Sequence, residues 1–415
     1  MIFFIFGCGG SNIMQRKLFL LEILRNTEVE DFLKAQRHAR IDELALRFSG
    51  KVNFPLAPVI EWIDALQRAE KKLPRHAAQD CYLTRKAVEQ ASSESTALYK
   101  ASQLKGKRLL NICGGIGVDD WAFAREFESI ISLEIDEDLH ELAGANRHKL
   151  AISNVHRQFC RAEDFFDQDT EHYEWIYADP DRRLAGKRWV SLADCSPNLA
   201  ELWPLIQQRS KFQLVKLSPL YPLEQLEKEL SGLFRIEVVS WQNEVKEVLA
   251  FCASERREGP ALRRSVSLAP EGEMHFEGLP EKGQTSSPIH KGYFYEAHPT
   301  LAKANLAVSY AHKLGLNILI PNGLFLQSEN ELPDFFGRSF EWVHGDGYSG
   351  KKFQHYLKTM GIGKANFTCR YFKQTPEELK KAHRIEDGGD NYFFFFDRGK
   401  DGPCFIHGKK LADKV

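Results

Sequence analysis

One segment, Leu109-Leu-Asn-Ile-Cys-Gly-Gly-Ile-Gly-Val-Asp-Asp-Trp121, constrains the fold of this chain more than any other. Its first residues are apolar and typical of a buried strand, its middle is a glycine-rich turn, and its end begins a helix. Gly115 and Gly117 allow the backbone of the turn to pass close under a ligand, because glycine has no side chain in the way. The segment therefore predicts an α/β core with a ligand site at this turn.

The region around this segment alternates short apolar stretches with amphipathic ones. Such alternation predicts a doubly wound, Rossmann-like parallel sheet, whose ligands bind at the carboxyl ends of the strands. We expect strands over 108–113, 129–136, 175–179, 212–217, 235–241 and 248–253, and helices over 121–127, 138–150 and 223–230.

The regions on either side of this core, which we assign to 100–269, have other patterns. Apolar residues recur at helical spacing from Val59 to Leu73, so we expect 1–99 to form an N-terminal helical region. The range 270–290 is rich in Gly, Pro, Ser and Glu and is the best linker candidate. Beyond it the chain is rich in aromatic residues and of mixed α+β character.

Composition excludes several classes of protein. The 56 Lys and Arg and the 57 Asp and Glu give a net charge of −1, which supplies no overall attraction for nucleic acid or anionic membrane. The eight cysteines contain no C-x-x-C pair and the 14 histidines show no metal-ligand spacing, so we expect no metal site. No apolar run reaches the roughly 18 residues of a membrane span. A cytoplasmic protein with no membrane partner is the expectation.

Two carboxylates indicate what binds at the glycine turn. Glu134 and Asp136 follow Gly117 by seventeen and nineteen residues, at the end of the next strand, where a carboxylate can bind the hydroxyls of a ribose. A nicotinamide dinucleotide would need glycine at position 120, and Asp119 and Asp120 would repel its phosphates. S-adenosylmethionine has no phosphate and carries an ammonium and a sulfonium, so we favour it. The alternative is that the two aspartates only cap a helix.

Further motifs, in their order along the chain, give a resemblance to a family. They are Glu89-Gln-Ala-Ser-Ser-Glu94 with Ala97-x-Tyr99-Lys-Ala101, the turn from Asn111 to Asp119, Asp179-Pro-Asp-Arg-Arg183, and Val215-Lys-Leu-Ser-Pro219 with Glu244-Val-Lys-Glu247. With them the chain resembles class I S-adenosylmethionine-dependent methyltransferases, and among these the bacterial proteins with a THUMP-like C-terminal domain. The resemblance implies a ferredoxin-like module over 291–336, which contains Tyr293-Phe-Tyr-Glu296, and a THUMP-like module over 337–415.

The resemblance also implies cofactor-binding roles, with two departures from the family pattern. Asn111 stands where the family usually has an acidic residue that holds the methionine moiety. Arg161 stands at the usual aspartate for the adenine amino group, so that contact would fall to Glu163 or Asp164. The implied cofactor-binding set is Asn111, Gly115, Gly117, Glu134, Asp136, Glu163 and Asp164.

Asp179 and Arg182 are the candidate catalytic residues. In methyltransferases of base amino groups the fourth strand ends Asp/Asn-Pro-Pro-aromatic, whereas this chain has Asp181 and Arg182 in the last two places. Asp179 can accept a hydrogen bond from an amine, and Arg182 can stack on a base or bind a phosphate. The alternative is that Asp181 pairs with Arg182 or Arg183 and closes the strand end. For Lys216 a substrate contact and a salt bridge are equally good interpretations.

The stretch from Gly345 to Arg384 indicates the substrate. It has nine Lys and Arg against three acidic residues, with aromatic residues between them, a combination that suits RNA. The alternative is a solvated helix face over an aromatic core. THUMP modules bind structured RNA, so the resemblance implies tRNA or rRNA, while a protein or small-molecule acceptor and a non-catalytic RNA-binding module stay open. The cations are Lys351, Lys352, Lys358, Lys364, Arg370, Lys373, Lys380, Lys381 and Arg384, and the aromatics are Tyr348, Phe353, Tyr356, Phe367, Tyr371 and Phe372.

Overall fold

The structure is a computed structural model that describes residues 21–23, 25–182, 191–255, 259–399 and 402–411. The chain divides into two compact units, which are treated separately below. The first consists of Met1–Leu217, Lys228–Gly232 and Phe251–Arg257, and the second of Ser218–Glu227, Leu233–Ala250 and Glu258–Val415. No helix among the described residues is long and apolar enough to cross a membrane.

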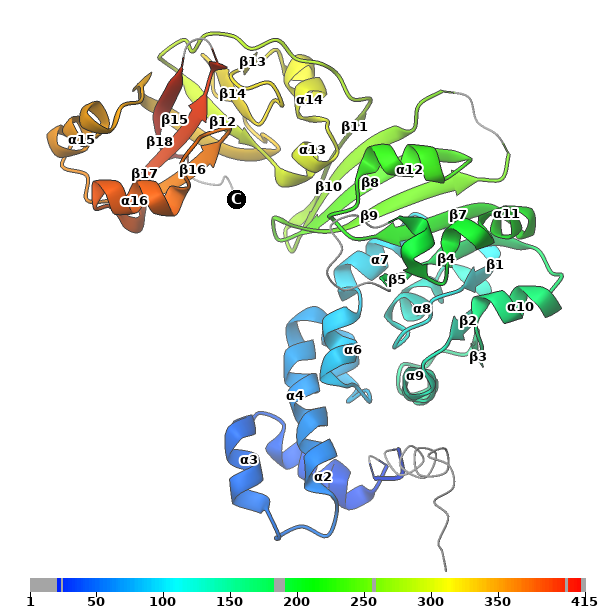
Figure 1. The fold of residues 1–415 in the computed structure, drawn as a ribbon. Helices are drawn as coiled ribbons and strands as arrows, with labels where there is room; N and C mark the ends of the chain where they lie inside the picture. Colours follow the sequence, from blue (N-terminus) through cyan, green and yellow to red (C-terminus); the bar gives the residue numbers. More distant parts are fainter. Residues whose placement is uncertain (1–20, 24, 183–190, 256–258, 400–401, 412–415) are drawn as a thin grey trace, which may run out of the picture. The chain divides into compact units, whose positions relative to one another are not determined.

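The N-terminal part of the first unit is helical, as expected (Figure 1). Helix α4 buries one face because Val59, Trp62, Ile63, Leu66 and Ala69 recur at a spacing of three and four residues. The helices of this part are α2 (Thr27–Gln36), α3 (Ile41–Phe48), α4 (Leu56–Lys72), α5 (Pro74–Ala78), α6 (Arg85–Gln90) and α7 (Glu94–Ser102).

The first unit also contains the expected Rossmann-like sheet. Its strands run in the order β7-β4-β1-β2-β3, and every strand is parallel to its neighbours in this order. Asn111, the last residue of β1, is level with Ser132 and Tyr177, so three strands end at the same edge. The strands are β1 (Gly106–Asn111), β2 (Phe127–Glu134), β3 (Val155–Phe159), β4 (Tyr173–Ala178) and β7 (Ser210–Leu217), and the helices are α8 (Val118–Phe123), α9 (Glu137–Lys149), α10 (Ala162–Gln168) and α11 (Leu199–Arg209).

A short hairpin follows the fourth strand of this sheet. Strand β5 (Asp181–Arg182) pairs antiparallel with β6 (Cys195–Ser196), so Asp181 is opposite Ser196. The backbone of Arg182 belongs to this hairpin, whereas its side chain, like Arg183 as a whole, lies outside the described residues. The expected pairing of Asp181 with either arginine therefore stays a prediction.

The strands after the parallel sheet are β8 (Leu233–Trp241), β9 (Glu244–Ala253), β10 (Leu262–Ala269) and β11 (Gly272–Gly278), and α12 (Leu223–Glu229) precedes them. These elements lie in the second unit, except that the last residues of α12 and of β9 belong to the first. Strand β10 pairs parallel with β8 and antiparallel with β11. Strand β11 lies inside the range 270–290 that we expected to be a linker. It buries only Phe276, so its sequence has no apolar run that would predict a strand. Residues 279–290 form neither helix nor strand.

A second, mainly antiparallel sheet follows, with the strand order β13-β14-β12-β15-β18-β17-β16. Because β12 pairs with β15, the ranges 291–336 and 337–415 contribute strands to one sheet, and their division into a ferredoxin-like and a THUMP-like module stays a prediction. The strands are β12 (Tyr293–Ala297), β13 (Asn317–Ile318), β14 (Phe325–Ser328), β15 (Gly337–Gly347), β16 (Lys364–Arg370), β17 (Glu386–Asp397) and β18 (Pro403–Lys410), and the helices are α13 (Pro299–Lys303), α14 (Ala307–Leu314), α15 (Gly350–Thr359) and α16 (Pro376–His383).

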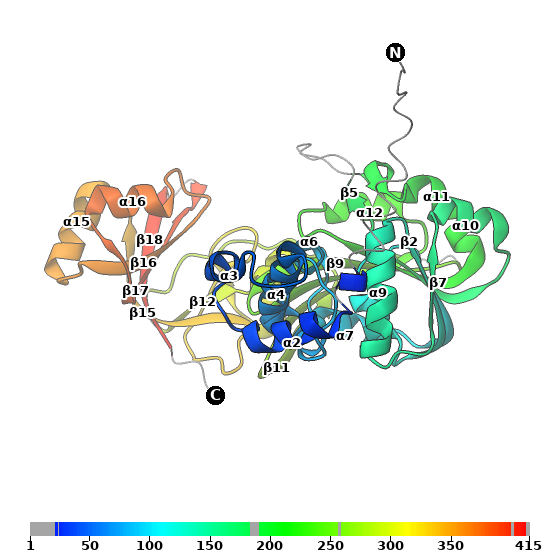
Figure 2. The ribbon, with the colours of Figure 1, turned by 90° about the horizontal axis from the view of Figure 1, so that it is seen from below.

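Helices α15 and α16 cover the β16–β17–β18 end of this sheet (Figure 2) and bury most of its aromatic side chains. Phe353 and Phe367 pack in the core between helices and sheet, and Tyr348, Tyr356 and Phe372 pack against it. Tyr371 alone among the six predicted aromatics is well exposed, at 60%. The prediction that these rings stack on RNA bases is therefore wrong for the buried ones, because the apolar face of α15 needs them as core.

Candidate active site

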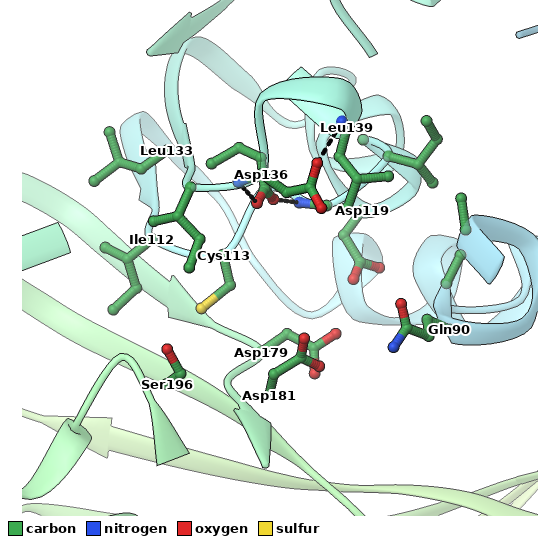
Figure 3. Close-up of a pocket in the computed structure, with 18 of the residues that line it drawn as sticks. Gln90, Ile112, Cys113, Asp119, Leu133, Asp136, Leu139, Asp179, Asp181 and Ser196 are labelled. Atoms are coloured by element: carbon green, nitrogen blue, oxygen red, sulfur yellow. Dashed lines mark hydrogen bonds between the residues drawn. The ribbon is translucent and has the colours of Figure 1, made fainter. Parts of the chain in front are cut away.

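A cavity of about 290 Å³ lies where the glycine turn meets the ends of β1, β2 and β4 (Figure 3). Its size is at the lower end of the range for small-ligand sites, roughly 300–1,000 Å³. Carboxylates outnumber cations among its described lining residues, so the cavity attracts positive charge and disfavours phosphate. The carboxylates are Asp119, Glu134, Asp136, Glu163, Asp179 and Asp181, and the cations are Lys86 and Arg161.

The glycine turn forms the floor of this cavity. Gly115 and Gly117 have φ values of 51° and 86°, in the left-handed region that favours glycine. Gly114 is required for a different reason: a Cβ atom there would lie 2.6 Å from Ser132 Oγ and 2.9 Å from the Leu133 carbonyl oxygen. The turn thus packs directly against β2, and the packing role of Gly114 was not evident from the sequence.

The two predicted ribose carboxylates both line the cavity, at the carboxyl end of β2. Glu134 accepts hydrogen bonds from the backbone N–H of Gly115 at 2.6 Å and of Asp136 at 2.7 Å, so it ties β2 to the turn. Burial raises the pKa of Glu134, although these N–H groups act in the opposite direction. Asp136 Oδ1 caps helix α9 by accepting from the N–H groups of Asp138 and Leu139.

Asn111, which we expected to bind the cofactor, lies beneath the turn and does not line the cavity. Its Nδ2 donates to Asp120 Oδ1 at 2.6 Å, and its Oδ1 accepts from the N–H of Cys113 at 3.0 Å. Asp120 also points into this buried layer, where Arg157 Nη1 lies 2.7 Å from Oδ2. Burial raises the pKa of Asp120, and the Arg157 charge opposes that rise. Asn111 is therefore a structural residue of the turn, because its polar atoms are used there.

Asp119, in contrast, faces the cavity. Its Oδ2 accepts hydrogen bonds from the Tyr177 hydroxyl at 2.8 Å and the Ser92 hydroxyl at 3.0 Å. Lys100 Nζ, on a side chain that is 0% exposed, lies 3.2 Å from Oδ1. Burial alone would raise the pKa of Asp119, but the charges of Lys100 and Lys216 and the Tyr177 hydrogen bond hold it below its usual value.

An adjoining hollow extends from the cavity past the end of β2. It is lined by Ile135, Phe159, Arg161 and Asp164, and it shares Ile135 and Arg161 with the cavity. Ile135 and Phe159 are 57% and 54% exposed, which is unusual for large apolar side chains and provides a surface for a flat, apolar ligand group. Asp164 lines only this hollow, whereas Glu163 lines the cavity and pairs with Arg161 at 3.4 Å.

Asp179 and Asp181 line the wall of the cavity that lies across from Asp136, with their carboxylates close together (Figure 3). Lys216 Nζ is 2.6 Å from Asp179 Oδ2, so the salt-bridge interpretation of Lys216 is correct. Burial and the Asp179 charge raise the pKa of Asp181. Burial also raises the pKa of the Cys113 thiol, which keeps it neutral and unsuited to act as a nucleophile. The described residues contain no cluster that could hold a metal ion.

Comparison with known proteins gives the class of enzyme to which the chain belongs. A family model described as THUMP domain-like matches residues 337–410. Two proteins of Mycobacterium tuberculosis, from strains CDC 1551 and H37Rv, are named as uncharacterised S-adenosylmethionine-dependent methyltransferases. Each is 26% identical over 323 residues, which cover 77% of this chain and 86% of the relative. A crystal structure of a methyltransferase from Porphyromonas gingivalis W83, itself assigned only provisionally, matches with a TM-score of 0.82 and 25% identity over 94% of this chain and 99% of the other.

The chain is an S-adenosylmethionine-dependent methyltransferase with a C-terminal THUMP-like domain. In this methyltransferase the segments identified from the sequence converge on one cavity, but their supporting residues were missed. Lys100, Tyr177 and Arg157 come from three separate elements. Tyr177 and Arg157 carry no local motif, and Lys100 lies in the motif Ala97-x-Tyr99-Lys-Ala101, which gives no indication that it pairs with Asp119. Ile135 had a usable signal, since it is an apolar residue between two carboxylates at a strand end.

Proposed function

We propose that this methyltransferase transfers the methyl group of S-adenosylmethionine to a structured RNA, a tRNA or an rRNA, that is held by the C-terminal region. The observation that supports this substrate is a positively charged surface on the THUMP-like domain. Residues 347–376 contain no acidic side chain. A surface of this kind neutralises phosphates, which dominate the affinity of proteins for nucleic acid.

The charge on this surface belongs to exposed side chains. Lys380 and Arg370 form ion pairs with Asp387 and Glu296, so their charges are partly compensated. The other exposed cations of α15, α16 and the segment between them form no ion pair within the described part of the chain. These are Lys351, Lys352, Lys358, Lys364, Lys373, Lys381 and Arg384. Lys351, His355 and Lys358 lie on one side of α15 and line a groove beside α16.

Within the cavity, we assign the ribose hydroxyls of the cofactor to Glu134 and Asp136, and the adenine ring to the exposed face of Ile135. Gly115 and Gly117 leave room for the cofactor above the turn, and Glu163 and Asp164 lie on the adenine side. The sulfonium of the cofactor supplies the methyl group. Asp179, which Lys216 holds in place at 2.6 Å, accepts a hydrogen bond from the acceptor amine and so orients it for in-line attack.

Two measurements on the full chain test the RNA substrate. Binding to total RNA, from cells that lack the protein, is followed by fluorescence anisotropy over a salt series. The Lys351→Ala, Lys358→Ala double variant should reduce the slope of log affinity against log salt by about two. A control double variant, Lys282→Ala, Lys313→Ala, removes two exposed lysines of the same unit elsewhere and should leave the slope unchanged.

Transfer of labelled methyl groups to the same RNA is the second measurement. We expect label in RNA from cells that lack the protein and much less in RNA from wild-type cells, where the position is already methylated. RNA binding that is absent or insensitive to salt, with label appearing in protein or small molecules, would replace RNA by one of those acceptors.

A further inference from the structure

Two carboxylates of the cavity wall have unequal surroundings. Asp179 follows the last residue of β4 and Asp181 begins β5, and both side chains reach the cavity (Figure 3). Lys216 Nζ lies 2.6 Å from Asp179 Oδ2 and compensates its charge. The Asp181 carboxylate, among the described residues, forms no hydrogen bond or ion pair. Positioning of the acceptor uses Asp179 and leaves Asp181 without a role.

Strand pairing holds Asp181 in place without help from its side chain. Its backbone pairs with Ser196 in the β5–β6 hairpin, and Ser196 also lines the cavity. Asp181 remains exposed, so both a ligand in the cavity and water can reach its carboxylate. The motif of base-amino methyltransferases has its second proline at this position, and proline has no side-chain group that can take up a proton. The carboxylate is thus a feature of this chain and not of the motif.

Charged groups from three other elements act on Asp181. Partial burial in the cavity wall and the charge of Asp179 raise the pKa of Asp181, while Lys216 on β7 and Lys86 on α6 oppose that rise. Cys113, in the glycine turn, adds no charge because burial raises the pKa of its thiol and keeps it neutral. Two carboxylates whose surroundings differ in this way can divide positioning and proton transfer between them.

Methylation of an amine releases a proton, and the acceptor site has to remove it. The nitrogen lone pair forms the new N–C bond, and the electron pair of the breaking C–S bond stays on sulfur, which becomes a neutral thioether. The nitrogen then carries a positive charge until it loses one hydrogen as a proton. A positioned base that takes this proton contributes typically about 10²- to 10⁴-fold to the rate.

We propose that Asp181 is the catalytic base that accepts this proton, while Asp179 holds the amine by a hydrogen bond. One carboxylate oxygen of Asp181 forms an O–H bond as the N–H bond breaks, and the proton then passes to water, because Asp181 is exposed. This role rests on the cofactor and the amine acceptor of the proposed function, but not on that amine belonging to RNA.

Rates of methyl transfer and the affinity for S-adenosylhomocysteine together test this role. The acceptor is an extract of cells that lack the protein, and label is counted separately in RNA, protein and small molecules, so the acceptor class need not be assumed. Asp181→Asn keeps the shape of the side chain but cannot take up the proton, so it should lower the apparent kcat at least about 10²-fold. The apparent KM for the extract and the calorimetric Kd for S-adenosylhomocysteine should stay within about twofold, because neither contact is lost.

The pH profile separates a base from a structural residue. The wild-type kcat should fall as acid protonates Asp181, with a midpoint above the usual pKa of an aspartate, because partial burial and Asp179 raise it. Asp181→Asn should lack this fall. Lys86→Gln is the matched control, since it keeps Asp181 and removes a charge that lowers the pKa of Asp181. It should keep the plateau rate and move the midpoint to higher pH.

Asp181→Ala provides a second test, since formate or acetate can enter the space left by the side chain and take up the proton. Acetate, the stronger base, should restore more of the rate than formate. If Asp181→Asn no longer binds S-adenosylhomocysteine, this rescue decides, and restoration by neither anion overturns the proposal.

Two other results also overturn the proposal. In the first, Asp181→Asn keeps kcat within about twofold of the wild type. In the second, Asp181→Asn lowers kcat but retains the fall in acid, which would mean that Asp181 only shapes the cavity wall. Label in protein or small molecules instead of RNA would refute the RNA acceptor alone, whereas a wild type that transfers label to no fraction would refute both proposals.

Discussion

The base of the glycine turn depends on one buried ion pair, and its removal has a predictable cost. Arg157 and Asp120 have side chains only 5% and 3% exposed, and their closest atoms are 2.7 Å apart. Arg157 Nη2 also donates to the carbonyl oxygen of Gly115 at 2.8 Å. Arg157→Met leaves Asp120 as a buried charge with only Ser132 and Asn111 as donors. Removal of one partner of such a pair lowers the free energy of unfolding by about 3–5 kcal/mol. For Arg157→Met we expect a loss of about 3 kcal/mol, because these two donors remain.

Urea unfolding followed by tryptophan fluorescence measures this loss, with Trp121 beside the turn as a reporter. The Asp120→Asn, Arg157→Met double variant should recover most of the stability, because no uncompensated charge is left. The difference in unfolding free energy between the wild type and Arg157→Met should also become smaller as the pH falls from 7.5 toward 5. Without Arg157 the folded state binds a proton on Asp120 more readily than the unfolded state, so acid favours folding. A loss below about 1 kcal/mol, or a double variant as unstable as the single one, would refute this account.

Two further changes have contrasting expected effects on unfolding free energy. Gly114→Ala should lower the free energy of unfolding more than Gly115→Ala, because the Cβ added at Gly114 would lie 2.6 Å from Ser132 Oγ. The Cβ added at Gly115 has open space around it, so that substitution costs only about 1 kcal/mol of backbone strain. Equal losses of stability in urea unfolding would contradict this. Burial, with the Arg75 charge, lowers the pKa of His76 to about 4, and neither ring nitrogen forms a hydrogen bond among the described residues. Since the unfolded state binds this proton first, stability falls as the pH drops from about 6.5 toward 4, and His76→Leu should reduce the loss between pH 7.5 and 5 by about 2 kcal/mol; an unchanged pH dependence would show that His76 is not the group responsible.

The parts of this methyltransferase that were predictable from sequence are local ones. The glycine turn and the pair Glu134 and Asp136 occupy short contiguous segments, and their spacing along the chain predicts the ends of two successive strands. Strand β3 was missed because only Val155 among its residues is buried, so it lacks the apolar run that marked the other core strands. Strand β11 was missed for the same reason.

The C-terminal region shows how one sequence pattern divides into two roles. Lysines and aromatic residues alternate there, and the pattern alone was compatible with an RNA-stacking surface or with a core. Packing of α15 and α16 on the second sheet decides this, since it buries Phe353 and Phe367 and leaves Lys351 and Lys358 exposed. The charges thus remain at the surface, while most of the rings do not.

The sequence by itself determined the class of enzyme, the position of the glycine turn and the carboxylates at the end of the second strand. Only the tertiary structure decided which side chains face the cavity. Asn111 and Asp120 are turned beneath the floor, while Asp119, next to Asp120 in the chain, points into the cavity against Lys100. The physical reason is that buried charges require partners. Lys100 and Arg157, which pair with Asp119 and Asp120, lie 19 and 37 residues away in the chain, too far for a local sequence pattern to indicate the pairing.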